Sequence, residues 1–261
     1  MGILNVTPDS FADAGRYATL GAALSHARQM LAEGAAIIDV GGESTRPGAA
    51  AVSVEQELAR VVPVIEALSA ESGMLISVDT SRAEIIRAAA AAGAHMVNDV
   101  RALQLPGAAD AAVRAGMGIC LMHMQGEPRS MQAAPAYLDV VAEVAAFLRQ
   151  RAAALLSAGA APDSRCVDPG VGFGKSLAHN LELLRRLPEL DVMGLPVLVG
   201  ASRKSLLQKL TGRAVNERLA GSLALATAAV LYGARIIRAH DVAATVDAVR
   251  VAAAVRAAAT H

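Results

Sequence analysis

Short runs of apolar and β-branched residues recur along the chain, and between them lie longer segments whose apolar residues are spaced three or four positions apart. Apolar side chains at positions 24, 27, 30 and 31, and again at 58, 61, 62 and 65, illustrate this helical spacing. Each such segment is long enough for a crossover helix, so consecutive strands are expected to run parallel. The predicted strands cover residues 2–6, 36–40, 75–79, 95–100, 118–122, 165–168, 197–200 and 235–238.

This alternation of strand and helix, repeated eight times, predicts an α/β fold of the (β/α)8 barrel class, a TIM barrel. A doubly wound parallel sheet shares the same alternation and is the alternative. The barrel is favoured by the number of repeats and by polar residues at the strand ends, which a barrel gathers on one face. Those residues are Asn5, Asp39, Asp79, Asn98, His123, Asp168, Ser202, and the pair Arg238 and His240.

Composition and charge limit the partners that such a fold would have. A chain of 261 residues, 54% of them hydrophobic, can bury one large core, and we expect residues 1–261 to form a single domain. The formal net charge is +0 and the basic residues are spread along the chain, which argues against nucleic acid or a membrane surface. A small molecule is therefore the expected partner.

The two cysteines, Cys120 and Cys166, lie in apolar runs and predict free buried thiols in a reducing cytoplasm. We expect no signal peptide, because no pattern typical of one is found. The longest apolar run, residues 219–234, is interrupted by small polar residues and is too short to span a membrane. A cytoplasmic protein is the resulting prediction.

The segment 166–175 reads Cys-Val-Asp-Pro-Gly-Val-Gly-Phe-Gly-Lys and places Asp168 at the end of a short predicted strand. Pro169 ends the strand, and the glycines that follow allow the backbone to approach a flat ligand, with Phe173 as the one large side chain. A nucleotide phosphate loop would need glycine where Pro169 stands, and a dinucleotide fingerprint would need glycine in place of Lys175. Asp168 is therefore predicted to be central to a binding site.

Two predicted loops, residues 7–19 and 41–52, are long for connections between a strand and a helix. The second contains Gly-Gly-Glu-Ser-Thr-Arg-Pro-Gly, in which Arg46 and hydroxyl groups stand among glycines. This composition suits a mobile loop that closes over an anion. An ordinary surface loop is the alternative reading of both segments.

Seven short motifs occur in a specific order along the chain. They are GILNVTPDSF at 2–11, DVGGESTRPG at 39–48, SVDT at 77–80, ND at 98–99, DPGVGFGK at 168–175, SRKS at 202–205 and RAHD at 238–241. In that order and spacing the whole chain resembles the dihydropteroate synthase family. The resemblance implies an eight-stranded barrel that joins 4-aminobenzoate to 6-hydroxymethyl-7,8-dihydropterin diphosphate, giving 7,8-dihydropteroate and diphosphate in folate biosynthesis.

The chain departs from the family pattern at three places. The family's N-terminal hairpin would precede the first strand, whereas Met1 stands at the head of that strand, so the hairpin is expected to be missing. In the first loop Ala12 and Ala14 stand where serine and glycine are more usual, and Ala239 replaces a usual valine. None of these positions carries a charge.

Recognition of a pterin ring follows partly from chemistry and partly from the resemblance. The ring presents a guanidine-like edge of donors, for which the carboxylate of Asp168 is a natural two-point acceptor. By themselves, Asn98 could be a turn residue and Lys204 a solvated lysine at the start of a helix. The resemblance assigns the pterin site to Asp79, Asn98, Met122, Asp168, Phe173 and Lys204.

The leaving diphosphate requires cations and donors. Arg238 and His240 are spaced so that both project to the same side of one strand end, and Asn5 offers an oxygen for Mg²⁺, the expected cofactor. The histidines and cysteines show no zinc pattern. The resemblance assigns diphosphate to Asn5, Arg46, Arg238 and His240, metal to Asn5, and aminobenzoate to Phe11, Thr45, Pro47, Ser202 and Arg203.

A dissociative, SN1-like path is expected, in which charged side chains stabilise the departing anion and the cationic ring. No nucleophilic residue is required, and no Ser/His/Asp or Cys/His arrangement is found. The residues expected to carry the reaction are Asp79, Asp168, Lys204, Arg238 and His240. The resemblance also implies a homodimer.

Two other functions remain open at this point. A pterin-binding methyltransferase domain shares the barrel and the acidic pterin contacts, although the SRK and RAH motifs argue against it. A non-catalytic paralogue that binds a pterin or a partner protein would keep the fold and only part of the motifs. Retention of Asn5, Arg46, Lys204 and His240 argues against that second alternative.

Overall fold

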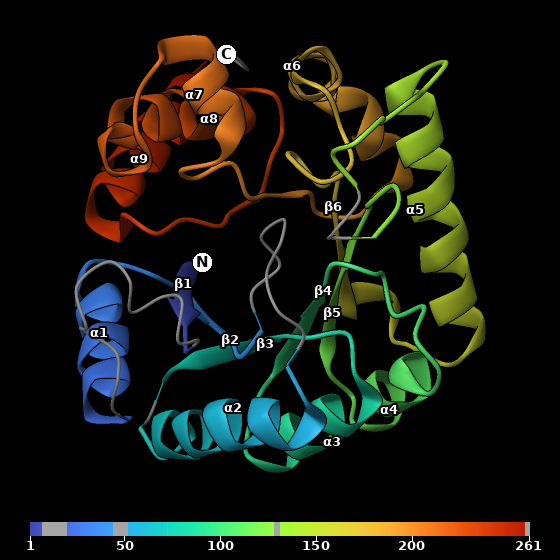
Figure 1. Ribbon diagram of the computed structural model, residues 1–261, viewed down its shortest axis with the longest axis vertical. Coiled ribbons are helices and arrows are strands. Elements are labelled where there is room, and N and C mark those ends of the chain that lie inside the picture. Colours follow the sequence, from blue (N-terminus) through green and yellow to red (C-terminus); the bar gives the residue numbers. More distant parts are fainter. Residues whose placement is uncertain (7–19, 44–51, 72, 128–130, 259–261) are drawn as a thin grey trace.

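The strands lie where the sequence predicts them, to within one residue at each end. The computed structural model describes residues 1–6, 20–43, 52–71, 73–127 and 131–258 (Figure 1). The strands are β1 (Gly2–Asn5), β2 (Ile37–Gly41), β3 (Leu75–Asp79), β4 (Met96–Asp99), β5 (Gly118–Met122), β6 (Arg165–Asp168), β7 (Leu198–Val199) and β8 (Ile236–Ile237).

The strands form a closed parallel ring. Strands β1 to β6 pair in sequence order as one parallel sheet, and β7 pairs with β8. Two parallel bridges complete the circle, one between Val167 and Val197 and one between Gly2 and Ala239. The amide of Ile3 also donates to the carbonyl of Ala239 over 3.1 Å. Because a doubly wound sheet stays open, this closure excludes the alternative and confirms the barrel.

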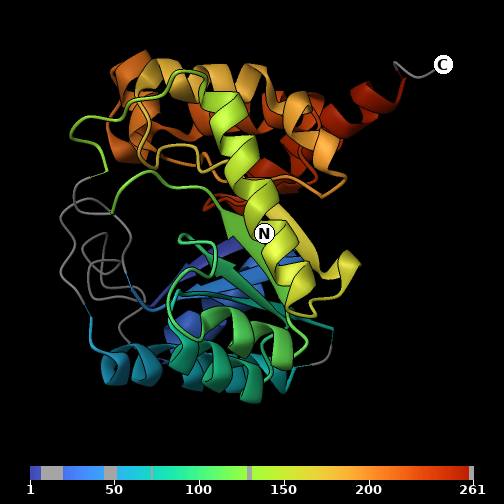
Figure 2. The same ribbon diagram turned by 90° about the vertical axis from the view of Figure 1, so that its right-hand side faces the viewer.

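Helices surround the strands on the outside, as the view in Figure 1 and the turned view in Figure 2 show. The α-helices are α1 (Leu20–Ala32), α2 (Val54–Ser69), α3 (Ala83–Ala91), α4 (Ala108–Arg114), α5 (Val140–Ser157), α6 (Leu177–Arg185), α7 (Ser205–Thr211), α8 (Leu219–Leu231) and α9 (Val242–Ala258). Short 3-10 helices cover η2 (Pro162–Ser164), η3 (Leu187–Met193) and η4 (Val215–Glu217).

Local sequence explains where several helices begin. Ser53 precedes α2 and accepts a hydrogen bond from the amide of Gln56, whose side chain accepts from the amide of Ser53 in return. Asp139 accepts from two amides in the first turn of α5. Such caps satisfy amides that have no partner inside the helix, and each typically contributes about 1 kcal/mol.

Alternating residues of the strands enter two separate apolar regions. The outward residues, such as Ile38 and Val40, are fully buried against the helices in the larger region. A smaller cluster inside the ring contains Cys120, Cys166 and Leu198, and both cysteines are free and buried as predicted. Since successive residues of a strand face opposite sides, Asp168, two positions after Cys166, also faces the interior.

Candidate active site

The polar residues at the ends of β1, β3 and β4 gather at the carboxyl end of the barrel, where Gly41 ends β2 between Asn5 and Asp79. Asn5 pairs in register with Gly41, Gly41 with Asp79, and Asp79 with Asn98. Parallel strands in a barrel present such residues to a common mouth, which is where binding sites of this fold are built. The predicted convergence of these side chains is therefore what the register produces.

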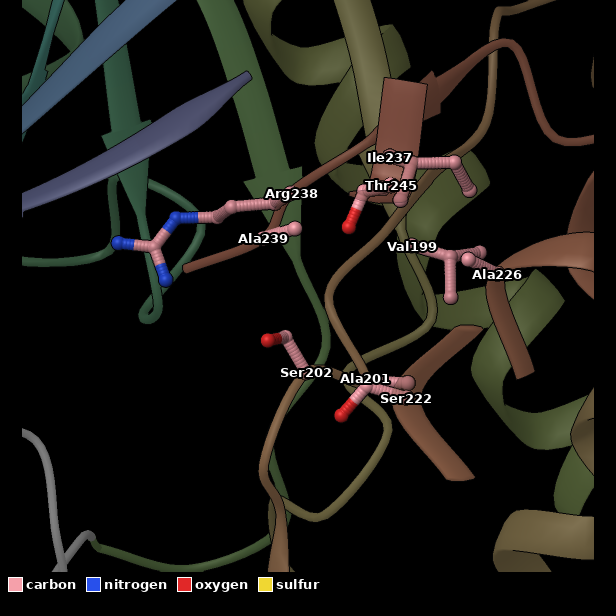
Figure 3. Close-up of a pocket in the computed structure, with 9 residues that line it drawn as sticks. All are labelled: Val199, Ala201, Ser202, Ser222, Ala226, Ile237, Arg238, Ala239 and Thr245. Atoms are coloured by element: carbon pink, nitrogen blue, oxygen red, sulfur yellow. The ribbon is translucent and has the colours of Figure 1, made fainter. Parts of the chain in front are cut away.

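Arg238 links two of the barrel's carboxylates. Its Nε donates to Asp39 Oδ2 over 2.6 Å and its Nη2 donates to Asp79 Oδ2 over 2.8 Å. Asn98 Nδ2 donates to the same Asp39 oxygen over 3.0 Å. Figure 3 shows the guanidinium extending away from a small cavity that lies behind it, between the last two strands and α8 and α9. With about 10 Å³ available, that cavity holds no more than a water molecule.

The charge on Asp79 depends strongly on these neighbours. Burial raises the pKa of Asp79 to about 7, and the nearby guanidinium of Arg238 opposes this rise. The carboxylates of Asp39 and Asp99 also contribute to this raised pKa, because like charges disfavour ionisation. A group with such a pKa can change its protonation state when a ligand brings donors to it.

Asp168 stands at the end of β6 beside two cationic side chains. Its Oδ1 accepts a hydrogen bond of 2.7 Å from the amide of Gly170. Burial raises the pKa of Asp168, and the ammonium of Lys204 is the largest opposing influence. Lys204 donates to the carbonyl of Val171 and lies 4.5 Å from the centre of the Phe173 ring. Burial lowers the pKa of Lys204 to about 8, although Asp168 favours its charged form.

Lys175 holds the glycine-rich loop against the end of β5. It is 2% exposed, and its Nζ donates to the carbonyls of Gly170 and Phe173 over 3.1 Å and 3.0 Å. The same atom lies 3.0 Å from His123 Nδ1, which can accept because burial and the charge of Lys175 lower the pKa of His123 to about 3. A Cβ at Gly170, where φ is +70°, would lie 1.9 Å from the carbonyl oxygen of His123. This contact explains why the loop requires glycine there.

The ends of β7 and β8 meet through side chains. Ser202 Oγ lies 3.0 Å from His240 Nδ1 and accepts from the amide of His240 over 3.2 Å. Arg203 adopts a left-handed backbone with φ of 57°, and its Nε donates to Asp241 Oδ2 over 3.0 Å. The ion pair with Asp241 therefore holds Arg203 in place between its sequence neighbours Ser202 and Lys204.

The predicted residues divide into those that the structure places and those that it does not. Asn5, Asp79, Asn98, Met122, Asp168, Phe173, Ser202, Arg203, Lys204, Arg238 and His240 all lie on strand ends or on the loops after β6, β7 and β8. Phe11, Thr45, Arg46 and Pro47 lie outside the described residues. The roles of all these residues remain predictions.

A family model described as "Pterin binding enzyme" matches residues 1–240. The chain is also 55% identical over 251 residues to the dihydropteroate synthase of Escherichia coli K12, covering 96% of this chain and 89% of that relative. This chain belongs to the dihydropteroate synthase family. The resemblance drawn from the motifs is thus confirmed, and with it the enzyme class.

Solved structures of the dihydropteroate synthase family superpose closely on this chain. The Yersinia pestis enzyme in a complex with a sulfonamide drug gives a TM-score of 0.95 at 51% identity, covering 98% of this chain and 94% of that one. The Xanthomonas albilineans enzyme with 4-aminobenzoic acid gives 0.92 at 52% identity, covering 98% and 92%. The same organism's enzyme in a complex with 7,8-dihydropteroate gives 0.89 at 50% identity, covering 98% and 93%.

The sequence predicts no binding or catalytic role for two residues that the structure places in the site. Asp39 is predicted only as a polar strand end, whereas it lies in the middle of β2, and Lys175 serves only to exclude a dinucleotide fingerprint. The structure places both in the buried polar network, with Asp39 0% exposed. For Asp39 the signal was a lone carboxylate among apolar strand residues, which is rarely tolerated without a partner.

Among the described residues, no group of three or more histidine, cysteine, aspartate or glutamate side chains is arranged to hold a metal ion. Within the same part of the chain, no helix is long and apolar enough to cross a membrane.

Proposed function

We propose that the polar mouth of the barrel binds 6-hydroxymethyl-7,8-dihydropterin diphosphate and joins its methylene carbon to 4-aminobenzoate. This proposal depends on the position of the Arg238 guanidinium beside Asp79 and Asn98. Arg238 donates directly to Asp79, and Arg238 and Asn98 both donate to one oxygen of Asp39. Carboxylates suit the donors of the ring, and a guanidinium suits diphosphate. The 4-aminobenzoic acid and the 7,8-dihydropteroate in the Xanthomonas albilineans structures support the same substrate and product here.

The pterin ring is proposed to bind at the β3, β4 and β6 ends. Asp168 Oδ1 already accepts from Gly170, which leaves Oδ2 to face the donor edge of the ring. Asp79 and Asn98 would add hydrogen bonds on the other side, and Lys204 would donate to a ring acceptor. Phe173 and Met122 would supply apolar contact, and Met122 is 3% exposed.

The diphosphate is proposed to bind at Arg238 and His240, with Arg46 contributing from its loop. Two of the three guanidinium nitrogens of Arg238 are held by Asp39 and Asp79, and among the described residues Nη1 has no hydrogen-bond partner, which leaves it to bind the anion. Mg²⁺ fits this donor set, because the amide oxygen of Asn5 and a carboxylate oxygen of Asp79 both lie beside the open side of Gly41. Magnesium takes most of its remaining ligands from water and phosphate oxygens, and it would neutralise charge on the leaving group.

The aminobenzoate site is proposed at the ends of β7 and β8 together with the two long loops. Ser202 is held by His240, and Arg203 is held by Asp241, so both enter the site from fixed positions. Phe11, Thr45 and Pro47 are proposed to complete this pocket.

A dissociative reaction suits this distribution of charge. The bond between the methylene carbon and the diphosphate oxygen breaks, and its electron pair leaves with diphosphate. The lone pair of the amine then forms the new carbon–nitrogen bond, and the amine releases one proton. Arg238 and His240 would stabilise the departing anion, while Asp79 and Asp168 would stabilise the cationic ring. A strong base is not required.

A diphosphate-release assay tests this function. The purified chain, pterin diphosphate and Mg²⁺ are expected to release diphosphate and form dihydropteroate when 4-aminobenzoate is present. A methyltransferase domain or a non-catalytic paralogue would bind the pterin and release no diphosphate in the same assay. Absence of aminobenzoate-dependent turnover in folded protein would refute the proposal.

Pterin affinity is expected to fall as the pH rises through about 8, the pKa to which burial lowers Lys204. Below that pH the ammonium is present and donates to the ring, and above it the charge is lost. Fluorescence titration with a pterin at pH 6.5 to 9.5 measures this fall in affinity. Lys204→Arg should bind with little pH dependence between pH 7.5 and 9.5, since arginine stays charged. The same fall in pterin affinity with pH in both proteins would rule out Lys204 as its cause.

We also propose that residues 1–261 act as one domain that assembles as a homodimer. Seven large apolar side chains on or between α7 and α9 are at least one third exposed, and such a concentration is typical of an association surface. They are Leu210, Val215, Leu219, Leu231, Tyr232, Val251 and Val255. Sedimentation is expected to report a dimer, and Val251→Glu is expected to yield monomer. A monomeric parent protein at micromolar concentration would refute this expectation.

A further inference from the structure

Asp39 occupies an unusual position for a carboxylate. It lies in the middle of β2, is 0% exposed and faces the interior of the barrel. One oxygen, Oδ2, accepts from both Arg238 Nε and Asn98 Nδ2, over 2.6 Å and 3.0 Å. The other oxygen, Oδ1, is buried and has no hydrogen-bond partner within the described residues. Burying a charge in this way is unfavourable unless its partners compensate for it.

The contacts of Asp39 fix the plane of a guanidinium. Arg238 is held at Nε by Asp39 and at Nη2 by Asp79, which are 2.6 Å and 2.8 Å away. Two anchors on different nitrogens define the orientation of a planar group, whereas one anchor leaves it free to swing. The side chain of Arg238 retains 19% exposure, so it is not enclosed on every side. In Figure 3 it points away from the residues that line the cavity behind it.

We propose that Asp39 is a positioning residue for the reaction. Its Oδ2 atom holds in place both the guanidinium of Arg238, which binds diphosphate, and the side-chain amide of Asn98, which binds the pterin. This inference rests on the proposed roles of Arg238 and Asn98. Asp39 itself touches neither substrate, because it is fully buried below both side chains.

The benefit to the reaction follows from this shared atom. The ring and its leaving group belong to one substrate, so their binding groups must be held at a fixed separation while the bond between them breaks. A single oxygen that accepts from both groups couples their positions more tightly than two independent contacts. A misplacement of about 1 Å at such a centre can lower a rate about 100-fold.

Asp39→Asn is the informative substitution, because it removes the charge and preserves the shape. The amide oxygen can still face Arg238 Nε, and the amide nitrogen can take the position of Oδ1, where none of the described donors points. The variant is therefore expected to fold. We expect kcat to fall about 100-fold and the Kd of inorganic diphosphate with Mg²⁺ to rise about tenfold. The Kd of 6-hydroxymethylpterin should rise by a smaller factor.

A double-mutant cycle with Arg238→Ala separates positioning from general weakening of the structure. If Asp39 acts through Arg238, adding Asp39→Asn to Arg238→Ala should change the diphosphate Kd by less than about twofold. Thermal unfolding of all the variants provides the control for folding. Effects on diphosphate Kd that multiply in the double variant would overturn the proposal, as would unchanged diphosphate affinity and kcat in folded Asp39→Asn.

The same measurements keep this inference distinct from the proposed function. If the parent protein binds diphosphate and Arg238→Ala does not, the role of Arg238 stands, and only the result for Asp39→Asn decides the role of Asp39. If diphosphate affinity is the same in the parent and in Arg238→Ala, the assignment of Arg238 fails first, and the role inferred for Asp39 fails with it.

Discussion

Arg238→Ala is expected to lower the rate of diphosphate release by about 10²–10³-fold. The guanidinium would meet the leaving group where its negative charge develops, so its loss affects the transition state more than the bound pterin. A pterin that lacks diphosphate should bind the variant nearly as well as the parent protein. Steady-state assays of diphosphate release, together with titration of 6-hydroxymethylpterin, measure the two effects separately.

The variant also leaves Asp39 and Asp79 without their cationic partner. Breaking a buried ion pair from one side typically costs about 3–5 kcal/mol of the free energy of unfolding, so rates must be expressed per folded molecule. Arg238→Lys is the matched control, because it keeps the charge but cannot donate to both carboxylates from one rigid plane. Its rate should lie between those of the other two proteins. Full diphosphate release by both variants would place the anion site elsewhere.

Asp168→Asn should weaken pterin binding by at least about 2 kcal/mol, which corresponds to roughly 30-fold in Kd. Asp168 Oδ1 accepts from the amide of Gly170, so in the variant the amide oxygen would stay there and the NH₂ group would face the donors of the ring. The opposite rotamer would instead place NH₂ against the amide of Gly170. Either arrangement opposes two donors, and a site built to bind a polar edge discriminates strongly against such a mismatch.

Titration calorimetry with a pterin analogue measures this loss, and binding of inorganic diphosphate with Mg²⁺ provides the control. The control affinity should be retained, because Arg238 and His240 are proposed to bind the anion and are unchanged in this variant. Thermal unfolding should show that the barrel remains folded. An unchanged pterin affinity would show that Asp168 does not accept the hydrogen bonds of the pterin ring.

The barrel itself could be predicted because its signal is local and repeated. Apolar spacing distinguishes strand from helix within each unit, and the eight repeats indicate closure even before the bridge from Gly2 to Ala239 is seen. The strands predicted at 95–100, 197–200 and 235–238 are each one residue shorter at both ends in the structure, as β4, β7 and β8. Their short hydrogen-bonded length depends on neighbouring strands and not on their own sequence.

The candidate site could be predicted only in part. Asp168 is identifiable because a carboxylate precedes a proline and several glycines, and the family motifs supply the other strand-end residues. The pairing of Ser202 with His240, 3.0 Å apart, was not predicted, because these residues were assigned to different substrates. Hydrogen bonds between residues far apart in sequence depend on which strand ends the closed barrel brings together.

Residue types and their spacing are enough to predict the order of strands and helices, the family and most of the polar strand ends, because these are local properties of the chain. Which of those polar groups share partners depends on the folded barrel. Arg238 and Asp39 are 199 positions apart, and they meet only because β8 closes against β1. The burial that lowers the pKa of Lys204 and the four contacts that hold Lys175 likewise exist only after closure. Water exclusion and long-range contacts arise from the assembled ring, and no short stretch of sequence specifies them.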